Sequence, residues 1–312
     1  RVYQKGVYYF DDVTLQMASS VVDISPEDEV QALRLSLVAP YFRGNIYASN
    51  PIKEIQGNIV INDETITKVD LVFSSQQEQL FVKEYTVKKG VYPFAIPAES
   101  LADGKYTITL TAYDGEGSVV ETKEQEINKL PPAPVEVVVR DDNMLLYNGE
   151  PFFPIGLWTP PLTSSAFRQY SDAGFNFLLM NAASDYLLNE AEKNNLKIVA
   201  KVTPEAPLAE LEQAKWKAEQ AERIAKYQDH PVLLAYFIAD EHLWLGRPFE
   251  PLMASYQIHK ELDPYRPLWQ NHAPRDTVQR LAVYDRACDI SSVDIFPVPE
   301  GSGHSELADK TL

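Results

Sequence analysis

The chain of 312 residues carries 45 acidic and 28 basic side chains, which gives a formal net charge of −17, and 45% of its residues are apolar. This length allows roughly two domains with cores of their own, and the negative charge argues against binding to nucleic acid or to anionic membrane surfaces. No stretch approaches the ~20 apolar residues that cross a bilayer, so we expect no membrane insertion, and a single cysteine, Cys288, excludes an intrachain disulfide framework.

Residues 1–22 do not match the pattern that follows them. The sequence starts at Arg1 without a methionine or an apolar leader, so we expect that a signal segment was removed or that an N-terminal part is missing. Residues 7–15 predict one strand, which resembles the closing strand of jelly-roll carbohydrate-binding modules. Because a lone strand cannot bury itself, residues 1–22 are predicted to be the remnant of such a module or an added edge strand of the next domain.

Residues 23–130 predict an all-β immunoglobulin-like sandwich. Apolar residues alternate with polar ones, as expected for strands with one buried and one wet face, and turn sequences such as Asp103-Gly104 separate them. The stretch before Tyr106 resembles the entry to the penultimate immunoglobulin-like strand, where a tyrosine hydrogen-bonds back across the corner. The predicted strands are residues 33–37, 58–61, 69–73, 80–87, 91–96, 105–113 and 119–127.

Residues 131–312 predict an α/β domain after the stiff linker of residues 130–134. A short hairpin (135–139 and 144–147, with an Asn148-Gly149 turn) precedes strands that alternate with helices. Such alternation indicates a parallel sheet, most simply strands one to six of an incomplete (β/α)₈ TIM barrel. A doubly wound sheet is the alternative, but no glycine-rich phosphate motif follows any strand. The predicted strands are 152–158, 175–181, 197–202, 233–239, 267–271 and 290–296, and the predicted helices are 163–173, 185–195, 208–227, 249–262 and 277–287.

Polar and aromatic residues gather where the predicted parallel strands end, which is where barrel enzymes place their active sites. The fourth strand is the most informative, because a fully apolar run ends in Asp240 and Glu241. Burying two adjacent carboxylates costs free energy unless they are used or paired, and burial would raise at least one pKa, as a general acid requires. The full set is Trp158, Asn181, Lys201, Thr203, Asp240, Glu241, His242, Asn271, His272 and Asp294.

The segment of residues 230–241 (HPVLLAYFIADE) resembles the fourth barrel strand of clan A glycoside hydrolases, the group that holds β-galactosidases, β-glucuronidases, β-mannosidases and many endoglucanases. The resemblance extends in order to residues 148–156 (NGEPFFPIG), 263–267 (DPYRP) and 288–297 (CDISSVDIFP), and so covers about 180 residues. A typical complete barrel has ~250 residues, so two βα units are expected to be absent from this chain.

The resemblance implies a retaining glycosidase that cleaves β-glycosidic bonds in a polysaccharide or oligosaccharide. Glu241 matches the acid/base, and Asp240 stands where the family usually has an asparagine that binds the sugar 2-hydroxyl. Phe296 replaces a tyrosine that steadies the nucleophile in many relatives, and we expect its ring to pack on a sugar face. The nucleophile, a glutamate after the seventh strand, is not in this chain, because Glu300 and Glu306 follow no seventh strand.

The remaining predictions concern substrate binding, and for most of these residues a purely structural role is the alternative. Trp158 and Trp244 are predicted to stack on a pyranose or to belong to the core, and Asp294 to bind ligand or to pair with Lys201. His242 is expected at the rim. Asn271 and His272 contact substrate or are loop residues. The predicted substrate-binding residues are Asp240, Trp158, Asn181, Asn271, His272, Trp244 and Phe296.

Two other functions compete with the glycosidase. A naturally incomplete barrel would bind or scaffold glycans without cleaving them. A metal-dependent barrel hydrolase would use carboxylate and imidazole ligands, although no H-x-H or H-E-x-x-H motif is present. The glycosidase needs no cofactor and no metal, its partner is a carbohydrate, and the resemblance implies a secreted, periplasmic or cell-surface location. The metal ligands would be Asp240, Glu241, His242, His272 and Asp294.

Overall fold

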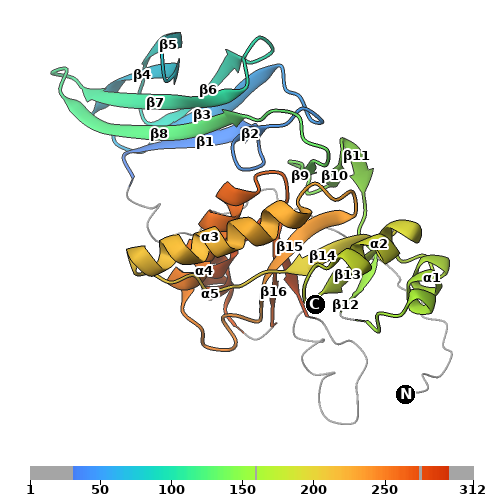
Figure 1. The fold of residues 1–312 in the computed structure, drawn as a ribbon. Helices are drawn as coiled ribbons and strands as arrows, with labels where there is room; N and C mark the ends of the chain where they lie inside the picture. The colour runs from blue at the N-terminus through green and yellow to red at the C-terminus, as the bar shows by residue number, and fades with distance from the viewer. Residues whose placement is uncertain (1–30, 159, 274–275, 295–312) are drawn as a thin grey trace, which may run out of the picture.

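The computed structural model describes residues 31–158, 160–273 and 276–294, which form a β-sandwich followed by an α/β part (Figure 1). The sandwich has a three-stranded sheet in the order β1-β3-β6 and a five-stranded sheet in the order β2-β8-β7-β4-β5. The predictions for residues 1–22 and for Phe296 lie outside the described residues. The strands are β1 (Leu33–Ala39), β2 (Asn45–Ile46), β3 (Glu54–Ile61), β4 (Ile66–Ser75), β5 (Gln79–Thr86), β6 (Gly90–Pro97), β7 (Gly104–Asp114) and β8 (Val119–Lys129).

Alternation of side chains builds the sandwich core. Strand β7 buries Tyr106, Ile108, Leu110 and Ala112 and turns the threonines between them outward, so each strand contributes only every second residue to the core. The Tyr106 hydroxyl donates to the carbonyl of Ala102 at 2.7 Å, which confirms the predicted bond across the corner. The two-residue strand β2 was not predicted, because a pair of residues is too short to show a period.

Three short antiparallel strands join the sandwich to the α/β part: β9 (Val137–Val139), β10 (Leu145–Tyr147) and β11 (Glu150–Phe152). The turn between β10 and β11 has positive φ at Asn148 (49°) and Gly149 (83°), as a type I′ hairpin requires. The predicted strand 152–158 is therefore wrong in its extent, because Phe152 ends β11 and β12 (Gly156–Trp158) begins after Pro154. A proline has no N–H for a ladder.

The α/β part is a six-stranded parallel sheet whose strands follow one another in chain order from β12 to β17. Sequential order rules out the doubly wound alternative, in which strand order reverses at a switch point. We call this sheet the half-barrel. Its further elements are α1 (Ser164–Asp172), β13 (Phe177–Met180), α2 (Asp185–Lys193), β14 (Lys197–Lys201), α3 (Glu210–Tyr227), β15 (Leu233–Asp240), α4 (Phe249–Leu262), β16 (Leu268–His272), α5 (Val278–Asp285) and β17 (Ile290–Val293).

The two faces of the half-barrel bury different residues. The helices pack on its outer face, where Ile198 and Ile238 meet helical residues such as Leu188 and Leu252. On the inner face Val199 and Phe237 share a core with β9 and β10. Helix α1 begins as predicted, with Thr163 as N-cap accepting from Ala166 N. None of the described helices is both long and apolar enough to cross a bilayer.

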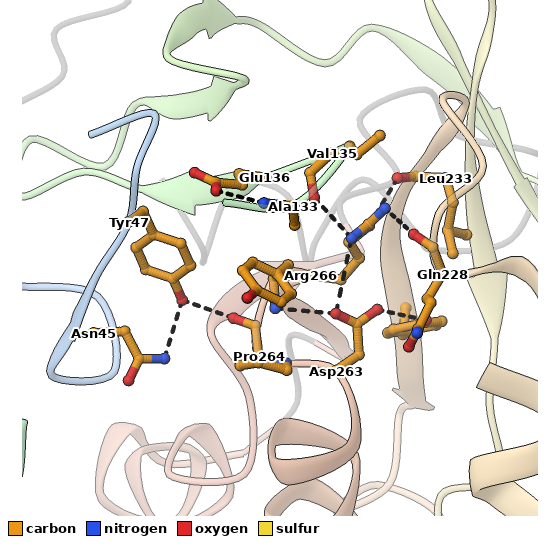
Figure 2. A network of polar contacts seen from close by, with 12 residues as sticks. Asn45, Tyr47, Ala133, Val135, Glu136, Gln228, Leu233, Asp263, Pro264 and Arg266 are labelled. Carbon is orange, nitrogen blue, oxygen red and sulfur yellow. Dashed lines mark hydrogen bonds and ion pairs between the residues drawn. The ribbon is translucent and has the colours of Figure 1, made fainter. Parts of the chain in front are cut away.

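The amino-terminal end of the half-barrel rests on the sandwich through buried polar contacts (Figure 2). Arg266 donates to the carbonyl oxygens of Leu233, Val135 and Gln228, and the sandwich residue Tyr47 donates to Pro264 O at 2.7 Å. The family-like DPYRP segment of residues 263–267 thus lies at the end of the sheet opposite to the predicted site. Its polar residues hold the fold together.

A buried ion pair adds a second link between the two parts. Arg43 of the sandwich donates Nε and Nη2 to the two carboxylate oxygens of Asp289, at 3.0 and 2.5 Å, and both side chains are almost fully buried. Asp289 also accepts from Tyr256 Oη at 2.9 Å and from Leu268 N at 2.7 Å. Burial alone would lower the pKa of Arg43. The Asp289 carboxylate raises this pKa by more than burial lowers it, so the pair stays charged.

Candidate functional site

Asp240 reaches the inner face of the half-barrel because β15 is irregular near its end. Phe237 pairs with Trp269, but the next pairs are Ala239 with Gln270 and Asp240 with Asn271, so one residue of β15 is unmatched. In a regular strand Asp240 would point away from the face that Phe237 occupies, since side chains alternate. The extra residue reverses that alternation, as a β-bulge does, and places Asp240 beside Asn271.

Asn271 connects two carboxylates that the sequence places far apart. Its Nδ2 donates to Asp240 Oδ1 at 3.2 Å and to Asp294 Oδ1 at 2.7 Å, while its Oδ1 accepts from Ser292 Oγ at 3.0 Å. The side chain is only 3% exposed, so these bonds fix its orientation. We call these four residues the Asn271 cluster; they are Asp240, Asn271, Ser292 and Asp294.

Glu241 follows β15 in a left-handed backbone conformation, with φ of 47°. Its N–H donates to the carbonyl of Asn271 at 2.8 Å, and its own carbonyl accepts from Leu245 N at 2.9 Å, so the chain turns sharply here. A left-handed residue other than glycine costs roughly 1–2 kcal/mol. Such strain is enriched at active sites, although in this chain Arg43, Asn143, Asn148 and Asn195 also have positive φ. The turn also ends the strict alternation that would force Asp240 and Glu241 onto opposite faces. Glu241 is half-buried and Asp240 is exposed, so the burial expected of these two carboxylates is partial for Glu241 and is not found for Asp240.

An aromatic pair lies deeper on the inner face. Trp158 of β12 meets Phe237 of β15 edge to face, with ring centroids 4.7 Å apart. The Lys201 ammonium lies 4.8 Å from the Trp158 centroid and 5.6 Å from that of Phe237. Trp158 is 42% exposed, so it is not a core residue, but Lys201 covers part of its ring. The alternative pairing of Lys201 with Asp294 is not what the structure has, because Asp294 binds Asn271.

The two predicted histidines lie away from this group. His272 is adjacent to Asn271 on β16 and points to the opposite face, where its Nε2 lies 2.8 Å from Asp285 Oδ1. His242, expected at the rim, is buried, and its Nε2 lies 3.2 Å from the carbonyl of Pro248. Burial lowers the pKa of His242. We therefore leave both out of the candidate site.

The predicted metal ligands do not converge, since their two histidines have other partners. In the described ranges no three His, Cys, Asp or Glu side chains come together as a metal site would need. Of the other predicted binding residues, Asn181 is exposed directly after β13 and lies beside the groove between the sheet and α3. Trp244 is 50% exposed in the turn after Glu241.

Sequence reasoning missed two members of the site. Ser292 links Asn271 to Trp269, whose Nε1 donates to Ser292 Oγ at 2.8 Å. Phe237 was read only as part of an apolar strand. The signal for Ser292 was present, because Ser291, Ser292 and Asp294 interrupt the apolar residues of the predicted strand 290–296. No signal distinguished Phe237 from its apolar neighbours.

No protein-family model matches the sequence, and no curated protein matches it in a sequence search. Among solved structures it is similar to a β-glucuronidase of Parabacteroides merdae, with a TM-score of 0.40 and 14% identity over 85% of this chain and 35% of that chain. A GH2 β-galacturonidase from Eisenbergiella tayi gives a TM-score of 0.41 and 13% identity over 89% of this chain and 52% of that one.

A β-D-mannosidase from Dictyoglomus thermophilum gives a TM-score of 0.35 and 16% identity over 69% of this chain and 32% of that chain. The chain thus spans about a third to a half of the length of these three structures. All three are named as glycosidases, but similarity at this level assigns no activity to the chain.

Proposed function

We propose that the chain carries the acid/base half of a retaining β-glycosidase that acts on a polysaccharide or oligosaccharide. The observation that carries the proposal is the turn at Glu241, a left-handed residue at the carboxyl end of β15 beside the Asn271 cluster. Active sites of (β/α)₈ barrels lie at this end of the sheet, and we propose that the six parallel strands, which follow one another in chain order, are the first six strands of such a barrel. The immunoglobulin-like identity of the sandwich belongs to the same proposal.

In the proposed reaction Glu241 protonates the leaving glycosidic oxygen and then deprotonates the water that attacks the glycosyl-enzyme. Asp240 accepts a hydrogen bond from the sugar 2-hydroxyl, and Asn271 holds Asp240 in place. Retention requires a second carboxylate about 5–5.5 Å from the first. None of the described residues is assigned that role, which we place on a seventh strand of the whole protein.

The glycan would approach from the open end of the half-barrel. Trp244, half exposed beside Glu241, and the free part of the Trp158 ring offer apolar faces on which a pyranose can stack. A glycan-degrading enzyme meets its polymer outside the cytoplasm, and we propose a secreted, periplasmic or cell-surface location on that ground.

Removal of the Glu241 carboxyl group tests the proposal. In the longest natural protein that carries this sequence, Glu241→Gln should lower kcat on glycosides with poor leaving groups by about 10²–10⁴-fold, the usual contribution of a general acid. Activated aryl glycosides, whose leaving groups need no proton, should lose far less in the first step. Initial rates on a series of aryl glycosides with leaving groups of different pKa measure this difference.

Glu250→Gln is the matched control, because Glu250 is an exposed carboxylate in the first turn of α4. It should leave every rate within about twofold of wild type. Equal losses for good and poor leaving groups in Glu241→Gln would show that Glu241 is not the acid. No turnover by the wild type, together with glycan binding that Glu241→Gln leaves unchanged, would favour the non-catalytic binding protein.

A further inference from the structure

Lys201 is a cation of the inner face that the proposed reaction does not use. It ends β14, where Val199 two residues earlier belongs to the inner core, and its ammonium stands over Trp158 and Phe237. Lys201 pairs in register with Phe237, which precedes Asp240 by three residues of β15. Asp240 pairs with Asn271, which lies only two residues after Trp269, the partner of Phe237 on β16, so at about 3.3 Å per residue Lys201 starts about 7 Å deeper along the strand direction than Asp240.

No carboxylate neutralises this lysine within the part of the chain that the structure describes. Lysines elsewhere in the chain do have acidic partners, such as Lys193 with Glu190 at 2.7 Å and Lys217 with Glu261 at 2.6 Å. The two aspartates of the site are turned toward Asn271. Among the described residues, Lys201 shares this lack of an acidic partner with lysines such as Lys197 and Lys83, whose ammonium groups also stand over aromatic rings, but of these three only Lys201 lies on the inner face near the Asn271 cluster.

The inner face is therefore divided by charge. The Lys201 ammonium of β14 stands over the rings of Trp158 and Phe237, and the carboxylates of Asp240 and Asp294 lie beside Asn271 at the ends of β15 and β17. A sugar bound between them would turn its hydroxyl groups toward the carboxylates, which accept hydrogen bonds. An anionic substituent on the same sugar would be repelled by the carboxylates and attracted by Lys201.

We propose that Lys201 recognises an anionic group, a carboxylate or a sulfate ester, on the sugar bound at this site, so that the substrates are acidic glycosides such as uronides. The inference rests on the proposed function only in that the site binds sugars. A hydrogen bond to a charged group contributes more than one to a hydroxyl. An acidic sugar should therefore bind roughly 10- to 100-fold more tightly than its neutral counterpart.

Matched pairs of ligands test the preference. The methyl β-glycosides of glucuronic acid, glucose 6-sulfate and glucose differ only at C6, and the galacto and manno series give equivalent sets. Titration calorimetry of the wild-type protein should show tighter binding of a charged sugar than of the neutral sugar in at least one series. Comparison of the carboxylate ligand with the sulfate ligand shows whether Lys201 recognises one anion or both. A neutral sugar that binds as well as its charged partner in every series, or no binding of any charged sugar, overturns the proposal.

Lys201→Met should abolish the preference by weakening the charged ligand roughly 10- to 100-fold while changing the neutral ligand less than about threefold. Lys197→Met is the matched control, because Lys197 lies on the same strand with its ammonium 3.7 Å from the Tyr147 ring centroid, at the opposite end. A Lys201→Met protein that keeps the preference would contradict the assignment. Because this experiment measures binding and not hydrolysis, its result can be interpreted even if the glycosidase proposal fails.

Discussion

At the scale of single residues, the site depends on one strained backbone and one shared amide. Glu241 adopts a left-handed conformation that glycine would adopt without strain. The Asn271 amide separates two carboxylates that would otherwise repel each other, and Ser292 holds its oxygen. Both features hold carboxyl groups in a fixed arrangement at a cost in folding stability. Such a trade-off is common at functional sites.

The strain at Glu241 leads to a prediction. Glu241→Gly should raise the free energy of unfolding by about 1 kcal/mol, since it removes the left-handed penalty, and should raise Tm by roughly 2–4 °C while abolishing the proposed activity. Glu250→Gly is the control, because Glu250 is helical and glycine there should cost about 1 kcal/mol. Thermal unfolding of both variants gives the signs, and a lower Tm for Glu241→Gly would show that the turn is unstrained.

At the scale of elements, α4 packs on the sheet through a buried histidine. His259 Nδ1 lies 2.8 Å from the carbonyl of Ser255 and 3.2 Å from its hydroxyl, which in turn donates to Thr203 O after β14. The ring also meets the edge of Trp216 of α3. The neutral imidazole thus links two helices to the chain that leaves β14.

Burial lowers the pKa of His259, and the bond to Ser255 offsets this only in part; burial also lowers the pKa of His242. Both histidines should therefore stay neutral in the folded state at pH values where the unfolded chain, with a pKa of about 6.5, takes up protons. The contribution of these two histidines to the free energy of unfolding is therefore fully present above about pH 7 and falls as the pH drops through 6.5.

The measurement is the urea midpoint between pH 8 and 5.5. We expect it to fall for the wild type and to fall less for His259→Phe, which keeps a ring against Trp216. Identical pH dependence of the two proteins would mean that His259 does not titrate between the two states.

At the scale of the whole molecule, the sandwich is fastened to the end of the half-barrel that lies away from the site (Figure 1). The Arg43–Asp289 pair and the Tyr47–Pro264 bond both reach segments that precede strands β16 and β17. The carboxyl end, with Asp240 and Asn271, therefore stays clear of these contacts. The same strands that are anchored by the sandwich carry Asn271 and Asp294 at their other ends.

Loss of one partner of the buried pair should be costly. Arg43→Met leaves the Asp289 carboxylate buried without its cation, and we expect a loss of about 3–5 kcal/mol in the free energy of unfolding. Arg140→Met is the control, because Arg140 pairs with Asp142 in an exposed position, where solvent screens the pair and its loss should leave the free energy of unfolding almost unchanged. Urea denaturation compares the two variants, and similar losses would refute the structural role of the Arg43 pair.

The sequence alone determined most of the element order. Period-2 alternation located the sandwich strands, and the limits of α4 were predicted at residues 249–262, where the structure has Phe249–Leu262. Local chemistry also predicted the Thr163 cap and the Tyr106 bond. Such features depend on neighbours within a few residues, so the residue pattern itself contains them.

Only the tertiary structure decided which side chains meet. Asn271 and His272 are adjacent in the sequence, yet one joins the site and the other faces α5, because side chains alternate on a strand. Asp240 reaches Asn271 because an unmatched residue in β15 reverses its alternation. That irregularity and the left-handed turn at Glu241 depend on pairing with β16, a strand about 30 residues away, and no local pattern encodes them.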